Sequence, residues 1–164
     1  MIELLVLDVD GTLTDGKITY TSNGDEIKSF DVKDGFAIAS WVKILGKKVA
    51  IITGRNSKLV EKRANELGVT HLYQGIHNKD EVLQNILEKE NLTWEQTAGI
   101  GDDVNDFKML QKVGISFCVA DAVSEIKELC DIVCTQNGGQ GAVREMIEYI
   151  LKNDQNKALK ELWV

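Results

Sequence analysis

Apolar runs and stretches of helical spacing alternate along the whole chain. The run ELLVLDVD near the start is almost continuously apolar and predicts a strand that is buried on both faces. The same reasoning predicts further strands over residues 49–53, 71–75, 98–103, 115–120 and 132–135. Apolar residues at helical spacing predict helices over residues 34–46, 57–67, 78–90, 106–114, 124–130 and 141–152.

Residue types that favour helix ends sharpen four of these boundaries. Asp34 is expected to cap the first helix, which should stop at Gly46. Gly68 is expected to close the second helix. Asn78 and Glu81 have the spacing of a capping box, which predicts the start of the third helix.

One segment departs from the alternation of strands and helices. In ITYTSNGDEIKSF, polar and apolar residues alternate around Asn23-Gly24, which predicts a β-hairpin. The rest of the pattern predicts an α/β fold, a Rossmann-like three-layer sandwich with a mainly parallel sheet. We therefore expect one domain over residues 1–152, with a hairpin insertion at 16–30 after the first strand, and a C-terminal tail over 153–164.

Composition and charge argue against several classes of partner. The 164 residues carry a net charge of −7, from 19 basic and 26 acidic side chains, and no basic stripe favours a nucleic acid. No apolar run reaches the roughly 18 residues that a bilayer requires, so no membrane partner is expected. The start of the chain lacks the pattern of a signal peptide, and we expect a cytoplasmic protein.

Polar residues follow three of the predicted strands at the point where each strand ends. Asp8 and Asp10 follow the first strand, Thr53-Gly54 end the second, and Asp102 and Asp103 end another. Because parallel strands meet with their carboxyl ends at one edge of a sheet, we expect these residues to gather there. Two acidic clusters with no His or Cys beside them favour a hard cation, Mg²⁺ rather than zinc.

Two further features favour a phosphate ligand at the same edge. Thr53-Gly54 is expected to open a helix, where free N–H groups, the helix dipole and the Thr53 hydroxyl attract an anion. Lys79 is expected in the first turn of its helix, where its positive charge opposes the helix dipole. A binding pocket that needs a positive charge would explain this placement. Mg²⁺, an anion site, a lysine and a free aspartate together favour phosphoryl transfer, in which a carboxylate attacks phosphorus.

These residues also carry a family resemblance. DVDGTLTD, ITGR, Lys79 and GDDVND match in order the four motifs of the haloacid dehalogenase superfamily of phosphatases, which the chain resembles. The resemblance implies that Asp8 is the nucleophile and Asp10 the general acid/base. It also implies that Asp8, the backbone carbonyl of Asp10 and Asp102 are the Mg²⁺ ligands.

The same resemblance assigns roles to the remaining motif residues. It implies that Thr53, Gly54 and Lys79 bind the phosphate. Asp103 and Asp106 are expected to be supporting acids that hold the metal or the lysine in place.

Almost the whole chain resembles one group in that superfamily, the 3-deoxy-D-manno-octulosonate 8-phosphate (KDO 8-phosphate) phosphatases. The matching stretches are DGKITYTSNGDEIKSFDVKDG, ITGR, YQGIHNK, GDDVND and GGQGAVRE. The resemblance implies no cap domain, a hairpin that contributes to a homotetramer core, and cleavage of KDO 8-phosphate to KDO and phosphate in lipopolysaccharide biosynthesis. Arg55 follows the expected phosphate-binding residues, and its guanidinium is expected to pair with the sugar carboxylate. Relatives that act on KDN 9-phosphate typically carry Glu at this position, so Arg55 favours the octulosonate as substrate.

Three alternatives stay open from the sequence. The first is a phosphatase of another sugar-acid phosphate, such as KDN 9-phosphate. The second is a receiver-like phosphoryl-binding signalling domain, which the order of the acidic motifs disfavours. The third is a domain detached from a sugar-acid cytidylyltransferase.

The end of the chain carries apolar residues that should dock on something. Leu159, Leu162 and Trp163 lie in the last segment, NDQNKALKELWV. We expect this tail to pack on a neighbouring subunit near its active site.

Overall fold

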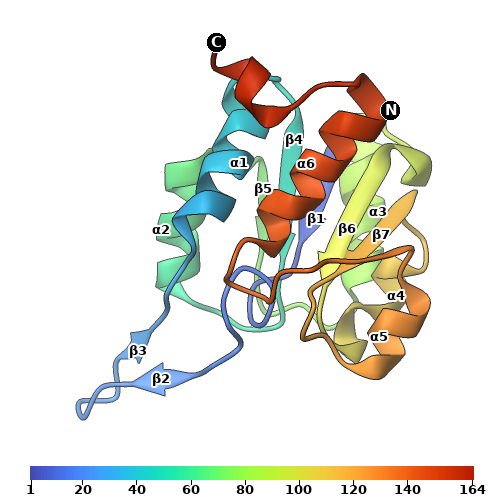
Figure 1. The fold of residues 1–164 in the computed structure, drawn as a ribbon. Helices are drawn as coiled ribbons and strands as arrows, with labels where there is room; N and C mark the ends of the chain where they lie inside the picture. Colours follow the sequence, from blue (N-terminus) through green and yellow to red (C-terminus); the bar gives the residue numbers. More distant parts are fainter.

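The chain folds around one sheet of six parallel strands. The computed structural model describes residues 1–164, and the sheet has the order β5-β4-β1-β6-β7-β8 (Figure 1). The strands are β1 (Leu4–Leu7), β4 (Lys48–Ile52), β5 (His71–Tyr73), β6 (Thr97–Gly101), β7 (Ile115–Cys118) and β8 (Ile132–Val133). All neighbouring strands in the sheet run parallel, which confirms the predicted α/β fold.

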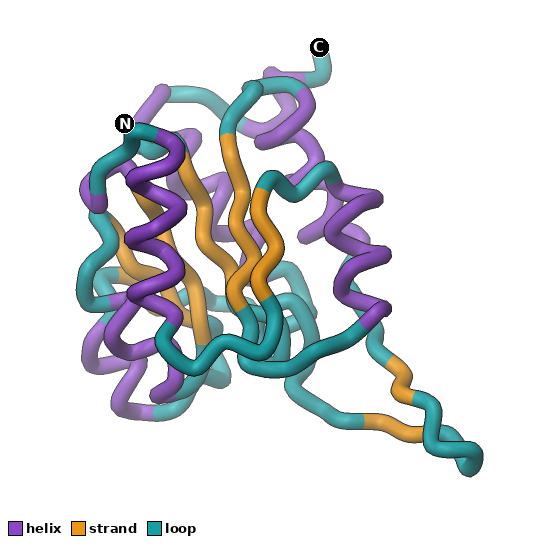
Figure 2. The backbone as a smooth tube through the Cα atoms, turned by 180° about the vertical axis from the view of Figure 1, so that it is seen from behind, coloured by secondary structure: helices purple, strands orange, loops and turns teal.

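Helices cover both faces of the sheet, and no separate cap domain is present (Figures 1 and 2). On one face α1 packs against α2 and α6, and on the other face α4 packs against α3 and α5. The helices are α1 (Val32–Lys43), α2 (Lys58–Leu67), α3 (Lys79–Glu90), α4 (Phe107–Leu110), α5 (Ser124–Leu129) and α6 (Ala142–Gln155), with 3₁₀ turns η1 (Trp94–Gln96), η2 (Val104–Asp106) and η3 (Leu159–Leu162). None of these helices has the length and apolar character needed to cross a membrane.

The central strand β1 sets the position of the residues that follow it. Its four residues are fully buried, as expected for a strand with helices on both faces. Leu7 pairs with Ile51 of β4 on one side and with Ile100 of β6 on the other. The carboxyl ends of these three strands therefore lie side by side, which is where the sequence places its acidic motifs.

The predicted hairpin is present and extends away from the body of the molecule. Its strands β2 (Thr19–Tyr20) and β3 (Glu26–Ile27) pair antiparallel, and Gly24 in the turn between them has φ 86°. Figures 1 and 2 show the hairpin leaving the fold beyond the carboxyl ends of the strands. The hairpin therefore starts directly beside the predicted site.

The predicted cap of the first helix is wrong. The side chain of Asp31 accepts hydrogen bonds from the N–H groups of Lys33 and Asp34, so α1 begins three residues earlier than expected. Asp34 instead accepts a hydrogen bond of 2.9 Å from the N–H of Arg144, in the first turn of α6. Both aspartates suit a cap by residue type, and only the packing of α1 on α6 decides between them.

The third helix begins where predicted, but its predicted capping box is wrong. Asn78 is the N-cap of α3, yet its side chain accepts no hydrogen bond from the helix. Its amide nitrogen instead donates to Glu81 Oε1 at 3.3 Å, because the two side chains face each other on the surface. Lys79 follows Asn78 as the first residue of α3, and its contacts are described below.

The end of the chain folds back onto its own first helix. α6 continues to Gln155, three residues beyond its predicted end, and η3 follows with Leu159 buried. The ring of Trp163 stacks on Phe36 with centroids 4.9 Å apart, and its indole N–H donates to Ser40 Oγ at 3.1 Å. In the single chain the tail therefore packs on α1, at the end of the molecule opposite the hairpin (Figure 1), and its contact with a neighbouring subunit stays a prediction.

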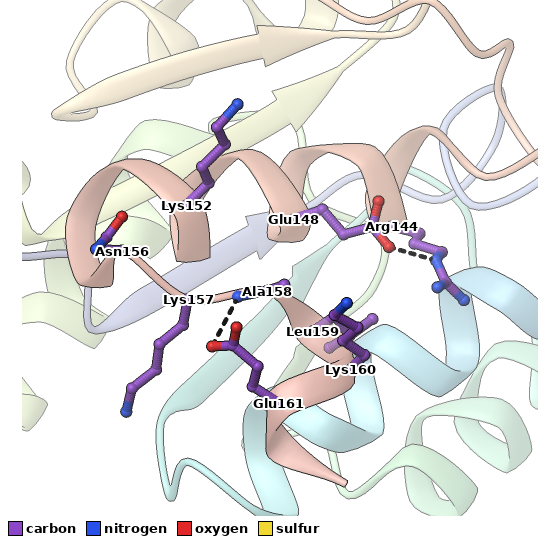
Figure 3. Close-up of a pocket in the computed structure, with 9 residues that line it drawn as sticks. All are labelled: Arg144, Glu148, Lys152, Asn156, Lys157, Ala158, Leu159, Lys160 and Glu161. Atoms are coloured by element: carbon purple, nitrogen blue, oxygen red, sulfur yellow. Dashed lines mark hydrogen bonds and ion pairs between the residues drawn. The ribbon is translucent and has the colours of Figure 1, made fainter. Parts of the chain in front are cut away.

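A surface cavity of about 600 Å³ lies between α6 and this terminal segment (Figure 3). Lysine side chains from both elements line it, including Lys152, Lys157 and Lys160. It includes none of the residues that the sequence analysis assigns to the site. This cavity is therefore separate from the acidic strand ends.

Candidate active site

The chain turns sharply after β1 and holds Asp8 at the turn. The N–H groups of Thr12, Leu13 and Thr14 all donate to the carbonyl of Val9, at 2.9 to 3.1 Å. Thr14 Oγ1 also accepts the N–H of Gly11 at 3.2 Å. These bonds give residues 8–16, called the Asp8 loop below, a compact and fixed shape, so that Asp8 is 3% exposed.

A buried lysine reaches Asp8 from the start of α3. Lys79 Nζ donates to Asp8 Oδ1 at 2.5 Å and to Asp106 Oδ1 at 2.6 Å. All three side chains are almost completely buried. Burial opposes the charge of Lys79, but the neighbouring carboxylates outweigh this and raise the pKa of Lys79. Its charge at a helix N-terminus, unfavourable for the dipole, is therefore explained by these two partners.

Three carboxylates meet at this point. One oxygen each of Asp8, Asp102 and Asp106 lies within 4.8 Å of the others. Burial, together with the neighbouring negative charges, raises the pKa of Asp8 to about 6, of Asp102 to about 6 and of Asp106 to about 7. Closely spaced carboxylates that resist ionisation in the free protein are the donor set that suits a hard divalent cation.

The three carboxylates differ in how much of their binding capacity is already used. Both oxygens of Asp106 already accept hydrogen bonds. Oδ1 accepts from Lys79 Nζ at 2.6 Å, and Oδ2 accepts from the N–H of Asp102 at 3.1 Å. Asp102 accepts only a long hydrogen bond of 3.4 Å from Thr12 Oγ1. Asp8 and Asp102 are therefore the carboxylates with oxygens free for a metal, while Asp106 holds Lys79 and the turn after β6 in place.

Two glycines allow the loops around this cluster to approach closely. Gly11 has φ 96°, and a Cβ atom at this position would lie 2.0 Å from Asp102 Oδ2. A Cβ atom on Gly138 would lie 1.8 Å from the carbonyl oxygen of Gly11. The loop before α6 therefore packs directly on the Asp8 loop, which itself lies against Asp102.

Asp10 is not part of this cluster and contacts the hairpin instead. Lys28 Nζ donates to Asp10 Oδ1 and also pairs with Glu26 at 3.1 Å. Arg55 pairs with the same Glu26 oxygen at 3.2 Å. The hairpin, the Asp8 loop and the segment after β4 are thus connected by one row of alternating charges.

The structure places the other predicted residues at the same edge with different surroundings. Thr53 is buried, and its backbone bonds to Tyr73 and Ile76 fix it at the end of β4. It does not open a helix, because α2 begins four residues after Gly54, with Ser57 as its cap. The expectation of a helix N-terminus at Thr53-Gly54 is therefore wrong.

Asp103 is exposed and does not contact Lys79 or the other carboxylates directly. Its Oδ1 accepts the N–H of Val104 at 2.7 Å, so that Asp103 caps η2. Its charge nevertheless contributes to the raised pKa of Asp102, after burial and the charge of Asp106. A supporting role for Asp103 remains a prediction.

The sequence analysis assigned no role to Lys28, Glu26 or Gly138. Glu26 and Lys28 are two positions apart in β3 and its extension, so that both side chains leave the same side of the hairpin. That spacing was visible in the sequence, but the side of the hairpin that faces the Asp8 loop was not. Gly138 lies within GGQGAVRE, whose contact partner is 127 positions away in the chain.

Comparisons with known proteins agree with the geometry of the site. Residues 70–147 match the family model described as haloacid dehalogenase-like hydrolase. The 3-deoxy-D-manno-octulosonate 8-phosphate phosphatase of Escherichia coli strain K12 is 47% identical over 150 residues, which cover 92% of this chain and 79% of that protein. The enzyme of the same name from Salmonella typhi is 46% identical over the same length.

Solved structures are similar over the same range. The 3-deoxy-D-manno-octulosonate 8-phosphate phosphatase of Moraxella catarrhalis, in complex with magnesium, phosphate and KDO, has a TM-score of 0.89 and 41% identity, over 92% of this chain and 86% of that chain. The cobalt-bound enzyme of Haemophilus influenzae has a TM-score of 0.87 and 39% identity, over 92% of this chain and 88% of that chain. Both relatives hold a divalent metal.

Proposed function

Because the chain belongs to the haloacid dehalogenase-like hydrolases, in one family with the 3-deoxy-D-manno-octulosonate 8-phosphate phosphatases, we propose that it cleaves KDO 8-phosphate to KDO and phosphate with Mg²⁺. The observation that carries this proposal is the meeting of Asp8, Asp102 and Lys79 at one sheet edge. These residues provide a nucleophile, a metal-binding carboxylate and a cation for the phosphoryl group.

The reaction has two steps, and Asp8 and Asp10 act in both. First, a carboxylate oxygen of Asp8 attacks phosphorus, the phosphorus–ester oxygen bond breaks, and Asp10 gives a proton to the leaving oxygen. This step releases KDO and leaves an aspartyl-phosphate on Asp8. Then water attacks phosphorus, Asp10 takes a proton from that water, and the bond to Asp8 breaks to release phosphate.

The other residues bind and orient the phosphoryl group. Asp8, Asp102 and the backbone carbonyl of Asp10 would hold the metal, since Asp106 already uses both oxygens. Bound Mg²⁺ would supply positive charge that stabilises the transferring phosphoryl oxygens. Lys79 adds a second positive charge at Asp8, and Thr53 and Gly54 provide hydrogen-bond donors at the neighbouring strand end.

Arg55 is the residue that we assign to the carboxylate of the sugar acid. Its side chain is 45% exposed, and it lies two residues after Thr53. In the free chain its guanidinium pairs with Glu26, so a substrate carboxylate would replace or join that partner. A neutral sugar phosphate lacks this contact and should be a poorer substrate.

The assembly and setting of the protein also form part of the proposal. Ile18, Tyr20 and Ile27 leave the hairpin with large exposed apolar surface, which favours a homotetramer built around hairpins. Such an assembly would cover an active site that no cap domain encloses. We place the reaction in the cytoplasm, in the synthesis of lipopolysaccharide.

The test is phosphate release from KDO 8-phosphate and KDN 9-phosphate side by side, with Mg²⁺ and with a chelator. We expect Mg²⁺-dependent turnover that is at least about tenfold more efficient on KDO 8-phosphate, because relatives that act on KDN 9-phosphate typically carry Glu at the position of Arg55. Asp8→Asn should abolish phosphate release, and Asp25→Asn, in the exposed hairpin turn, is its matched control. Equal activity with and without metal, or no turnover of either ester, would refute the proposal.

A further inference from the structure

The side chain of Lys28 is covered although the residue belongs to a hairpin that extends into solvent. Its side chain is only 2% exposed, whereas its neighbour Ile27 is 47% exposed. The ammonium group therefore points inward, under the hairpin and towards the Asp8 loop. Burying a lysine charge costs several kcal/mol unless partners compensate for it, so its partners are the reason for this position.

Two carboxylates compensate for the buried charge, and one of them is Asp10. Lys28 Nζ donates to Asp10 Oδ1 and lies 3.1 Å from Glu26 Oε1. The second oxygen of Asp10, Oδ2, accepts no hydrogen bond from the protein and is not buried without a partner. Lys28 thus occupies one oxygen of Asp10 and leaves the other free to face a substrate.

The same contacts hold the hairpin in one orientation relative to the sheet. Its paired strands have only two residues each, which is too short to be stable without support. Glu26 pairs with Arg55, and hydrogen bonding to Tyr20 and to Glu26 raises the pKa of Arg55. Both strands of the hairpin therefore contact the body through charged groups, and the contact that ends at the Asp8 loop is Lys28.

We propose that Lys28 is a positioning residue for Asp10, which it holds by one carboxylate oxygen so that the other faces the leaving oxygen of the substrate. The inference rests on the proposed function, in which Asp10 transfers the proton. A carboxylate on a flexible side chain contributes fully to catalysis only when it is held within hydrogen-bond reach of the reacting atom. Lys28 also makes the orientation of Asp10 depend on how the hairpin is docked.

The test is a comparison of Lys28→Met with Lys28→Arg and with Lys17→Met, whose side chain lies exposed on the same hairpin. We expect Lys28→Met to lower kcat on KDO 8-phosphate about 10–100-fold, because a misplaced acid loses most of its effect, with KM within about twofold. Lys28→Arg should recover most of kcat, and Lys17→Met should match the wild type. Unchanged kcat in Lys28→Met would overturn the proposal.

A double-mutant cycle separates this role from simple anchoring of the hairpin. In the Asp10→Asn background, whose residual turnover is measured at high enzyme concentration, Lys28→Met should cause no further loss of kcat. Effects that multiply in the double variant would overturn the proposal, because Lys28 would then act without Asp10. If Lys28→Met does not fold, Lys28→Gln, uncharged but still a donor, takes its place in the cycle. A wild-type protein that releases no phosphate would instead contradict the proposed function.

Discussion

Lys79 Nζ lies 2.5 Å from Asp8 Oδ1, although the two residues are 71 positions apart in the sequence. The contact joins the end of the central strand to the first turn of a helix on one face of the sheet. Both side chains are almost completely buried, so the charge of each is stabilised mainly by the other rather than by water. The expected consequences concern catalysis, stability and metal binding.

Asp8→Asn should remove catalysis and preserve the fold. The amide has nearly the same shape but cannot attack phosphorus, so phosphate release should fall by at least about 10⁴-fold. Steady-state phosphate release, together with circular dichroism of the variant, checks this. A variant that keeps more than a few per cent of wild-type turnover would rule out Asp8 as the nucleophile.

Lys79→Met should destabilise the protein as well as inactivate it. It leaves Asp8 and Asp106 buried without their cation, and breaking a buried ion pair costs about 3–5 kcal/mol. Denaturant unfolding of this variant and of Lys89→Met, exposed at the other end of α3, gives the comparison. We expect less than about 1 kcal/mol for Lys89→Met, and equal losses in the two variants would contradict the role of Lys79.

Mg²⁺ should stabilise the protein more strongly as the pH rises. The pKa values of Asp8 and Asp102 are raised from 3.8 to about 6, so the folded protein binds more protons than the unfolded chain between these values. Without metal, stability therefore falls as pH rises through that window. Metal binding requires the ionised carboxylates, so its contribution grows across the same window.

Thermal unfolding with Mg²⁺ and with chelator, at pH 5 and pH 7.5, measures this effect. At a Mg²⁺ concentration of about 100 Kd we expect Tm to rise by roughly 5–10 °C at pH 7.5. At pH 5 the rise should be much smaller, because protons compete for the same oxygens. A metal effect that is equal at both pH values would contradict the assignment of these carboxylates as ligands.

Asp34→Ala should destabilise the start of α6. It removes the acceptor for the N–H of Arg144, a contact of the kind that contributes about 1–2 kcal/mol at a helix N-terminus. Asp34→Asn keeps an oxygen at this position and should retain most of the stability. Denaturant unfolding of both variants, beside Asp25→Ala in the hairpin turn, checks the prediction, and equal losses in all three would contradict it.

Trp163→Ala should lower stability without changing catalysis in the single chain. It removes the stack on Phe36 and the hydrogen bond to Ser40, which together contribute about 1–2 kcal/mol. Phosphate release should be unchanged, because the contact lies at the end of the molecule away from the hairpin (Figure 1). A loss of turnover would instead support the earlier expectation that the tail acts at a neighbouring subunit.

Residue types and spacing predicted the strands, most helices and the acidic strand ends. Apolar runs such as the one before Asp8 predict buried parallel strands well, because a strand with helices on both faces accepts few polar side chains. Errors occurred where two residues of the same type compete for one role. Asp31 and Asp34 both suit the cap of α1, and the structure selects Asp31. Thr53-Gly54 were expected to open a helix, although the apolar spacing had already placed the helix start at residue 57, where the structure has it.

The chain's local pattern by itself determined which residues end the central strands, and hence that Asp8, Thr53 and Asp102 share one edge. Only the tertiary structure decided that Lys28 faces Asp10, that Asp34 caps α6, and that Gly138 supports the Asp8 loop. The physical reason is the separation along the sequence between the residues that interact. Periodicity reports whether a residue is buried within its own element, whereas the partner of a buried charge or a close backbone contact comes from elements far away in the sequence.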